Sequence, residues 1–380
     1  LALVQGLQTD YGRRPSYAGG TILNGLIHLG LNLEDLDLSG ICLRQVDLRN
    51  QEAKRLNLAG ADLTHSVFTQ TFGRVEAVAV CPDGRRFAIG GDGGYVRIYD
   101  IASRQFLLAL SGHTNTVAGL AFGPDGKLLA SASHDGTVRL WDLERAQQTH
   151  VWHTQGAMLA VGFSPDGALL IGVGHTGVVY LWDVVRGLLR DSLEGHDDII
   201  RSLAVHPHGH LFATGSIDGE IRLWALRGER PGRSVAVQHD VSSVIALAFS
   251  PDGLLLASGG HTGTVALWEA EGLDPLVSFQ AHAMETRALA FGADSRTLYS
   301  GGGGASSIRI WDVERNELLT RLSQDGTTRS LGLTPDGKTL VSGREDGTVN
   351  LWNDAGTEKT TLIHTVSGFR MSLTTMAWSG

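Results

Sequence analysis

The sequence predicts an all-β fold that is assembled from a repeated unit of short strands. A strand that ends in an aromatic residue and then a polar residue or alanine recurs seven times, from Tyr99 to Trp352, at intervals of 41 to 44 residues. A Pro-Asp-Gly turn precedes five of these strand ends, and glycine makes up 50 of the 380 residues, which is about twice its usual share. The turn prolines are Pro82, Pro124, Pro165, Pro251 and Pro335.

Within each unit, an apolar strand leads into the turn, a second strand follows, and a glycine-rich turn opens the strand with the aromatic end. Residues 128–133 and 137–141 are two such strand-like runs, bounded by turn residues. No window after residue 70 keeps the apolar period of a helix. These features favour strands throughout the repeated region.

The length and residue pattern of this unit resemble the WD40 repeat, and seven units cover residues 70–364. By this resemblance the region is a seven-bladed β-propeller, with one four-stranded sheet per repeat around a central channel. A ring of sheets also hides the strand edges that an open stack would expose. Residues 360–364 read as an outer strand, and the tail, residues 365–380, begins like an eighth repeat. We expect seven closed blades; an eighth composite blade or a second propeller is the alternative.

A shorter period of five residues runs through residues 31–69, where leucine, phenylalanine or alanine fills the third place of all eight units. A period of five fits neither a strand nor a helix. It resembles the pentapeptide-repeat family, whose fold is a right-handed β-helix with the stacked leucines inside. The last unit, residues 66–70, also reads as an outer propeller strand. Residues 1–30 are expected to form a linker and a short helix, because their apolar residues between positions 22 and 29 follow a helical spacing.

Composition excludes several classes of function. The net charge of -9 argues against a nucleic-acid partner, because phosphate binding needs a basic surface. No apolar run approaches the length of a membrane helix. Two cysteines, Cys42 and Cys81, cannot build a disulfide framework, so a reducing, cytoplasmic location is expected. The chain begins with Leu1, and we expect it to be part of a longer protein.

Two motifs look chemical but have simpler structural explanations. Residues 332–339 match the phosphate-loop pattern G-x4-G-K-T, yet that loop must lead into a helix, and here a strand follows the turn. His206, His208 and His210 form an H-x-H-x-H run at a hairpin turn, with no cysteine or carboxylate beside it. The sequence therefore predicts no enzyme activity, no cofactor and no physiological metal.

His113, Ser131 and Asp135 are the residue types of a hydrolase triad. Together with Trp141, they also stand where the WD40 family places a structural tetrad, in which buried polar groups satisfy one another. The fourth unit repeats the set 83 residues later, which favours a structural role. Its members are His196, Thr214, Asp218 and Trp224. The other units carry incomplete sets, and the first and third depart furthest from the pattern.

The most informative functional signal is the residue six places before the turn proline, at the start of each inner strand. We call this set the mouth residues: Glu76, Ala118, Leu159, Arg201, Ile245, Arg287 and Arg329. His134, His175 and His261, each just before a tetrad acid position, should lie on the same top face. An arginine and histidine mouth on an acidic protein suits an acidic peptide, phosphate or other anion. The alternative is a set of scattered, solvated charges.

The order of the parts carries a further resemblance. A helix, pentapeptides, the junction at residues 66–73 and then WD40 repeats look like the C-terminal part of bacterial STAND-type signalling ATPases. In that family an NB-ARC ATPase core precedes the repeats, which hold it closed and sense the trigger. The resemblance implies a ligand-sensing, autoinhibitory module that binds a protein or peptide on the propeller's top face. The alternative hypotheses are a free-standing WD40 scaffold that assembles a multiprotein complex, and a propeller enzyme or metal-binding protein.

Overall fold

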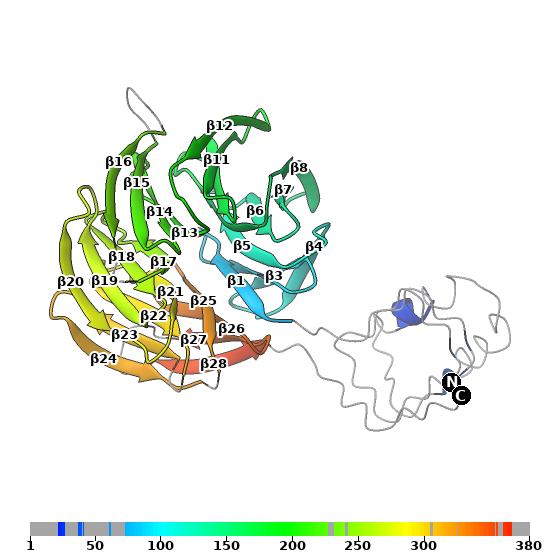
Figure 1. Cartoon of the computed structure of the whole chain (residues 1–380). Helices are drawn as coiled ribbons and strands as arrows, with labels where there is room; N and C mark the ends of the chain where they lie inside the picture. The colour runs from blue at the N-terminus through cyan, green and yellow to red at the C-terminus, as the bar shows by residue number, and fades with distance from the viewer. Residues whose placement is uncertain are drawn as a thin grey trace, which may run out of the picture. The chain divides into compact units, whose positions relative to one another are not determined.

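The computed structural model divides the chain into two units, which are described separately: residues 1–71 with 367–380, and residues 72–366. It describes residues 22–26, 37–39, 41, 61, 73–226, 232–239, 242–304, 307–324, 326–353, 355 and 360–366. The second unit is all-β. Its strands form seven antiparallel sheets of four strands each, which confirms the predicted seven-bladed propeller (Figure 1).

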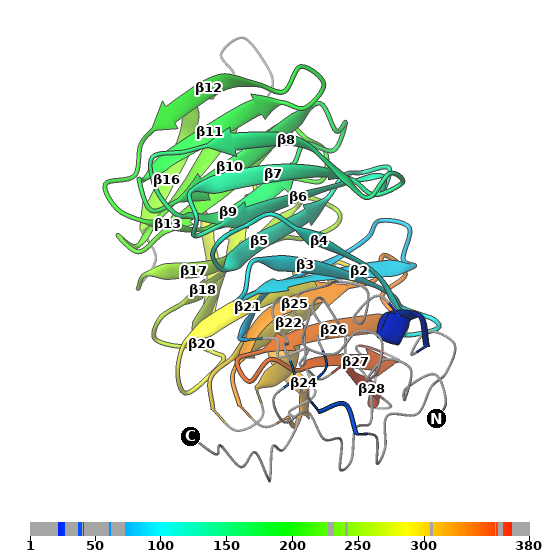
Figure 2. The same ribbon diagram turned by 90° about the vertical axis from the view of Figure 1, so that its right-hand side faces the viewer.

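The strands of each sheet follow one another in chain order from the inner to the outer edge. Blade 1 holds β1 (Val75–Val80), β2 (Arg86–Gly91), β3 (Tyr95–Asp100) and β4 (Phe106–Ser111). Blade 2 holds β5 (Val117–Phe122), β6 (Leu128–Ser133), β7 (Thr137–Asp142) and β8 (Gln147–His153). Blade 3 holds β9 (Met158–Phe163), β10 (Leu169–Gly174), β11 (Val178–Asp183) and β12 (Leu188–Glu194), which Figure 2 shows side by side.

The remaining blades repeat this arrangement. Blade 4 holds β13 (Ile200–Val205), β14 (Leu211–Ser216), β15 (Glu220–Ala225) and β16 (Ser234–His239). Blade 5 holds β17 (Val244–Phe249), β18 (Leu255–Gly260), β19 (Thr264–Glu269) and β20 (Pro275–Gln280). Blade 6 holds β21 (Thr286–Phe291), β22 (Thr297–Gly302), β23 (Ile308–Asp312) and β24 (Glu317–Leu322). Blade 7 holds β25 (Thr328–Leu333), β26 (Thr339–Arg344), β27 (Val349–Asn353) and β28 (Thr361–Val366).

The hydrophobic core lies between neighbouring blades, because each sheet buries both faces of its middle strands. Strands β10 and β14 are buried along their whole length, whereas the outer strand β12 is almost entirely exposed. Trp141 of blade 2, for example, packs in one cluster with Val96 and Ile98 of blade 1. The aromatic strand ends that define the repeat therefore join each blade to the one before it.

The Pro-Asp-Gly segments form tight hairpin turns between the first two strands of a blade. In the turn after β25, Gly337 has a φ of 72° and its N–H donates to the Thr334 carbonyl at 2.8 Å. The left-handed φ explains the glycine. Because β26 follows this turn directly, residues 332–339 lack the helix start that a phosphate loop requires.

The ring closes by side-chain contacts between blade 7 and blade 1. Strand β1 lies beside β25, which places the two ends of the propeller next to each other (Figure 1). The Val78 N–H donates to Ser330 Oγ at 2.9 Å, and Arg329 Nη1 lies 2.8 Å from Glu76 Oε2. The outer strand of blade 7 is β28, in the region where the sequence predicted it. The predicted second role of residues 66–70 and the start of an eighth repeat lie outside the described residues.

The first unit is described only in short stretches. Residues 22–26 form a helix, as predicted, and Leu23 on it is fully buried. Leu38 and Ile41, at the third and first places of their pentapeptides, are also buried. The rest of the predicted β-helix lies outside the described residues. Among those that are described, no helix has the length and apolarity needed to span a membrane.

Candidate functional site

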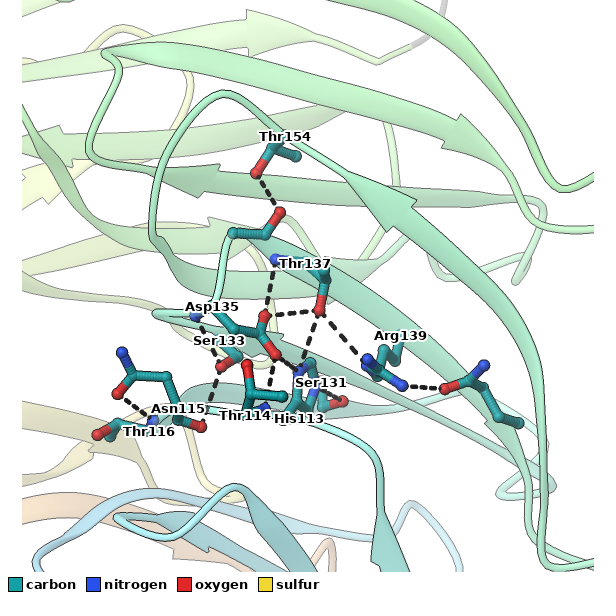
Figure 3. A network of polar contacts seen from close by, with 12 residues as sticks. His113, Thr114, Asn115, Thr116, Ser131, Ser133, Asp135, Thr137, Arg139 and Thr154 are labelled. Atoms are coloured by element: carbon teal, nitrogen blue, oxygen red, sulfur yellow. Dashed lines mark hydrogen bonds and ion pairs between the residues drawn. The ribbon is translucent and has the colours of Figure 1, made fainter.

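The tetrad of blade 2 is a single chain of buried hydrogen bonds (Figure 3 shows three of its members). Trp141 Nε1 donates to Ser131 Oγ at 2.8 Å. Ser131 Oγ lies 2.7 Å from His113 Nε2, and His113 Nδ1 lies 2.9 Å from Asp135 Oδ2. The indole can only donate and the carboxylate can only accept. Each group therefore donates to the next: Trp141 to Ser131, Ser131 to His113, and His113 to Asp135.

Electrostatics keeps this tetrad in one protonation state. Burial alone would raise the pKa of Asp135, but hydrogen bonds from Thr137, the Thr114 N–H and His113 lower it to about 2. Burial lowers the pKa of His113, so its ring stays neutral. The Ser131 and His113 side chains are closed to solvent, and a substrate therefore has no route to the hydroxyl. The geometry suits a structural network and not a hydrolase triad.

Blade 4 repeats this network. Trp224 Nε1 donates to Thr214 Oγ1 at 2.7 Å, His196 Nε2 lies 2.7 Å from the same oxygen, and His196 Nδ1 lies 3.3 Å from Asp218. In the described part of the chain, the one close group of three potential metal ligands is His196, Asp218 and Glu220. Because His196 and Asp218 bond each other and Glu220 pairs with Arg222, the tetrad accounts for this group.

Blades 6 and 7 use partial versions of the tetrad. In blade 6, Ser300 Oγ joins His282 Nε2 and Trp311 Nε1, both at 2.9 Å. In blade 7, Gln324 replaces the histidine: its Oε1 accepts from Ser342 Oγ at 3.3 Å. Sequence reasoning missed Gln324, although it precedes Ser342 by 18 residues, the spacing that also separates His282 from Ser300.

In place of the tetrad, blade 3 has an aromatic stack that it shares with β8, the outer strand of blade 2. The ring centroids of His150 and Trp152 are 5.5 Å apart, those of Trp152 and Trp182 are 5.3 Å apart, and Tyr180 lies 5.7 Å from Trp182. Trp152 Nε1 donates to the Gly187 carbonyl at 2.8 Å. The incomplete polar set that the sequence shows in this blade is therefore compensated by stacked rings.

The H-x-H-x-H run lies in the turn between β13 and β14. His206 is buried, its Nε2 donates to the Gly253 carbonyl at 2.9 Å, and its Nδ1 accepts from the His208 N–H at 3.2 Å. Both ring nitrogens of His206 are thus in use, so His206 has none left to bind a metal. His210 Nε2 lies 3.6 Å from Glu271 Oε1, a carboxylate that the local sequence did not indicate. The turn has a structural explanation.

The channel mouth is a cavity of about 440 Å³, and all seven mouth residues line it. Each of them lies at a β-bulge, where the pairing of the inner strand with the second strand shifts by one residue. In β13, Ile200 pairs with Ser216 and Ser202 pairs with Gly215, so Arg201 has no pairing residue on β14. The same shift occurs in the inner strand of every blade. Such β-bulges re-aim a side chain, and here they place one residue per blade at the channel.

Ion pairs hold two of the three mouth arginines. Arg329 Nη1 lies 2.8 Å from Glu76 Oε2, and its Nη2 lies 3.1 Å from Glu345 Oε1. Arg287 pairs with Glu285. The sequence pattern that placed His134, His175 and His261 on the top face also includes Glu345, whereas Glu285 was not predicted to take part.

Arg201 differs from the other two arginines. In the portion of the chain that the structure describes, no hydrogen bond or ion pair within 4 Å engages its guanidinium. Burial lowers its pKa, with further lowering by the positive charges of Arg287 and Arg329. Arg201 is therefore a half-buried cation in a cavity that offers room for an anion.

The three predicted histidines lie near the same mouth. His134 lines the cavity, and its ring centroid is 6.1 Å from that of His175. Burial lowers the pKa of His134, and the charge of Arg201 lowers it further. His261 Nδ1 lies 2.9 Å from Glu285 Oε1, and Glu285 in turn pairs with Arg287. His261 is thus connected to the mouth residue Arg287 by way of Glu285.

A second layer of residues lines the cavity below the mouth. Two positions after each mouth residue, every inner strand carries an aliphatic residue that borders the cavity and also packs in a hydrophobic cluster between blades. We call this set the aliphatic ring: Val78, Leu120, Val161, Leu203, Leu247, Leu289 and Leu331. Sequence reasoning missed it, although the spacing that found the mouth residues also marks these seven positions.

Comparison with protein families places the fold and the repeats. The family described as WD domain, G-beta repeat matches seven segments, which together cover more than half of the chain. They are residues 63–100, 104–142, 145–183, 187–225, 232–269, 273–312 and 317–353. The chain belongs to the WD40 family. Pentapeptide repeats (8 copies) match residues 32–70, which confirms the predicted second repeat and overlaps the first WD40 segment.

Relatives of this WD40 propeller include proteins from bacteria, plants and animals. The WD repeat-containing protein alr2800 of Nostoc is 35% identical over 101 residues, 27% of this chain and 8% of the relative. A guanine nucleotide-binding protein subunit beta of Zea mays is 25% identical over 170 residues, 43% of this chain and 35% of the relative. Human Striatin-4 is 31% identical over 174 residues, 43% of this chain and 19% of the relative. The matched segments span less than half of each relative.

Proposed function

We propose that this propeller is a protein-interaction module that receives an acidic group of its partner at the channel mouth. WD40 propellers are scaffolds that bind protein partners, which sets the general class. The observation that carries the specific proposal is Arg201, a half-buried guanidinium that lines a cavity of about 440 Å³. Among the described residues no acid lies within ion-pair distance of it, although Glu76 and Glu285 act on it from further away. A carboxylate from a bound protein would supply that partner.

The neighbouring groups support the same role. Arg287 and Arg329 are oriented by Glu285, Glu76 and Glu345, so their side chains are fixed before a partner arrives. Fixed groups lose less conformational entropy on binding. His134, His175 and His261 would form part of the contact surface around the cavity.

Arg201→Gln is expected to weaken the capture of the partner at least about tenfold, because a hydrogen bond to a charged group contributes about 1.5 to 3 kcal/mol. The purified chain serves as bait in an extract of the cells that encode it, and bound proteins are quantified. The matched control is Arg315→Gln. Arg315 lies in the turn between β23 and β24, at the end of blade 6 that is away from the mouth, and its side chain is 67% exposed. Equal capture by the wild type and both variants would contradict the proposal.

For the biological setting, we propose that the module is the sensing and autoinhibitory part of a STAND-type ATPase, with an NB-ARC domain in the same full-length chain. The support is the order of helix, pentapeptides and WD40 repeats, together with the length of alr2800, of which the matched segment is only 8%. A free-standing scaffold remains the competing proposal. The similarity to Striatin-4, of which the matched segment is 19%, is consistent with this alternative as well.

The intact mass of the native protein separates these two settings. The STAND proposal predicts a polypeptide several hundred residues longer than this chain, with a phosphate loop that leads into a helix. It also predicts nucleotide hydrolysis that rises when the propeller is deleted or its partner is added. A native polypeptide of this length, without nucleotide hydrolysis, would support the scaffold instead.

A further inference from the structure

The geometry of the channel points to one ligand chemistry: we infer that the cavity binds a single carboxylate attached to a short apolar group, as presented by a protein that ends in an apolar residue. The terminal carboxylate lies against Arg201, the last side chain enters the aliphatic ring, and the rest of the polypeptide leaves through the mouth. This inference rests on the proposed function and specifies the group that the partner inserts.

The charges around the mouth select a monoanion. Four guanidiniums surround it, those of Arg74, Arg201, Arg287 and Arg329, and the acids Glu76, Asp92, Glu285 and Glu345 pair with all of them except Arg201. Because the four positive and four negative groups balance, a dianionic phosphate would leave twice as much uncompensated negative charge as a carboxylate. One open guanidinium matches one carboxylate, whose two oxygens fit its planar fork.

Aliphatic residues in the lining of the cavity offer a contact for an apolar group beside the carboxylate. Leu203 follows Arg201 by two residues on β13, and both line the cavity. With a rise of about 3.3 Å per residue, the backbone positions of Arg201 and Leu203 lie about 7 Å apart along β13. A C-terminal leucine whose carboxylate contacts Arg201 would extend its side chain toward Leu203. Between the two layers lie small residues such as Ala246 and Ala288, which leave this path open.

A C-terminal residue fits this arrangement better than an internal aspartate or glutamate. In an acidic side chain the carboxylate is the end of the group, so nothing apolar extends beyond it into the aliphatic ring. In a C-terminal leucine the carboxylate and the side chain diverge from the same carbon. The carboxylate can therefore stay at Arg201 while the side chain continues inward.

Calorimetric titration of the full chain with short peptides tests this inference. The probes are acetyl-Gly-Gly-Gly-Leu with a free carboxyl terminus, the same peptide as its amide, the same peptide ending in glycine, 4-methylpentanoate, and inorganic phosphate. We expect the free acid to bind, amidation to weaken it at least about thirtyfold, and the glycine ending to weaken it about tenfold. Phosphate should bind more weakly than the free acid.

Variants assign each part of the ligand to its contact. Arg201→Gln should lower the affinity for the free acid about thirtyfold while the amide is unaffected, and Arg315→Gln should change neither. Leu203→Ala should lower the affinity for the leucine peptide but not for the glycine peptide. Equal binding of acid and amide, or unchanged binding to Arg201→Gln, would overturn the inference. Tighter binding of 4-methylpentanoate than of the peptide would replace the protein terminus with a free acid as the source.

The two proposals can fail separately. If Arg201→Gln loses its cellular partner while peptide binding ignores the terminal carboxylate, the ligand assignment is wrong and the interaction module stands. If the peptide series behaves as expected while cellular capture is unchanged, the carboxylate site stands and the partner docks elsewhere on the propeller.

Discussion

Replacing Ser131 by alanine lowers the free energy of unfolding of the propeller by about 3 kcal/mol. The hydroxyl is the central link between Trp141 Nε1 and His113 Nε2. Without it, two buried nitrogens lose their partner, and an unsatisfied buried polar group costs about 1 to 3 kcal/mol. Urea denaturation followed by tryptophan fluorescence measures the change.

Ser103→Ala is the matched control for this substitution. Ser103 is exposed in the turn after β3, where its hydroxyl donates to Asp100 Oδ1 at 2.8 Å. We expect this variant to stay within about 0.5 kcal/mol of the wild type. A loss below about 1 kcal/mol for Ser131→Ala would show that the tetrad contributes little to the stability of blade 2.

Acidification from pH 6.5 to pH 4 should remove about 2.5 kcal/mol of stability through His282 alone, and His282→Gln should abolish this component. Burial, with the charge of Arg309, lowers the pKa of His282 from 6.5 to about 4. In this interval the unfolded chain binds a proton at this position and the folded chain does not. The folded state therefore loses stability as the pH falls.

Blade 7 suggests why glutamine is a suitable replacement. There Gln324 already occupies the histidine position, and its Oε1 accepts from Ser342 Oγ. We expect His282→Gln to remain folded at pH 7.5 and to show a flatter dependence of unfolding free energy on pH. His208→Gln, at an exposed turn position, is the control and should keep the slope of the wild type. An equally steep slope in His282→Gln would contradict the assignment.

The fold was readable from the sequence because repetition multiplies a weak local signal. A single Pro-Asp-Gly turn indicates little, but the same turn at regular intervals, followed each time by an aromatic strand end, indicates a seven-bladed ring. The seven mouth residues were found by the same spacing. Their shared position at the channel follows from a β-bulge that every inner strand repeats.

The chemistry of the mouth was less predictable, because it depends on which charges meet in space. The spacing suggested three equivalent arginines, whereas Glu76 and Glu285 engage two of them and leave Arg201 open. Glu76 and Arg329 lie 253 positions apart, and only the closure of the ring brings them together. Gln324 was missed because its residue type differs from the histidine of the pattern. The aliphatic ring was missed because its residues look like ordinary core residues.

The most direct test of the account is the side-chain NMR signal of Arg201 in the presence of the captured partner. Arginine labelled with ¹⁵N gives separate Nε–H signals, and the signal missing from Arg201→Gln assigns this residue. The account predicts that the Arg201 signal shifts on saturation with the partner, while the signal of Arg315 stays in place. A partner that binds fully without moving the Arg201 signal would contradict the claim that the channel mouth is the binding site.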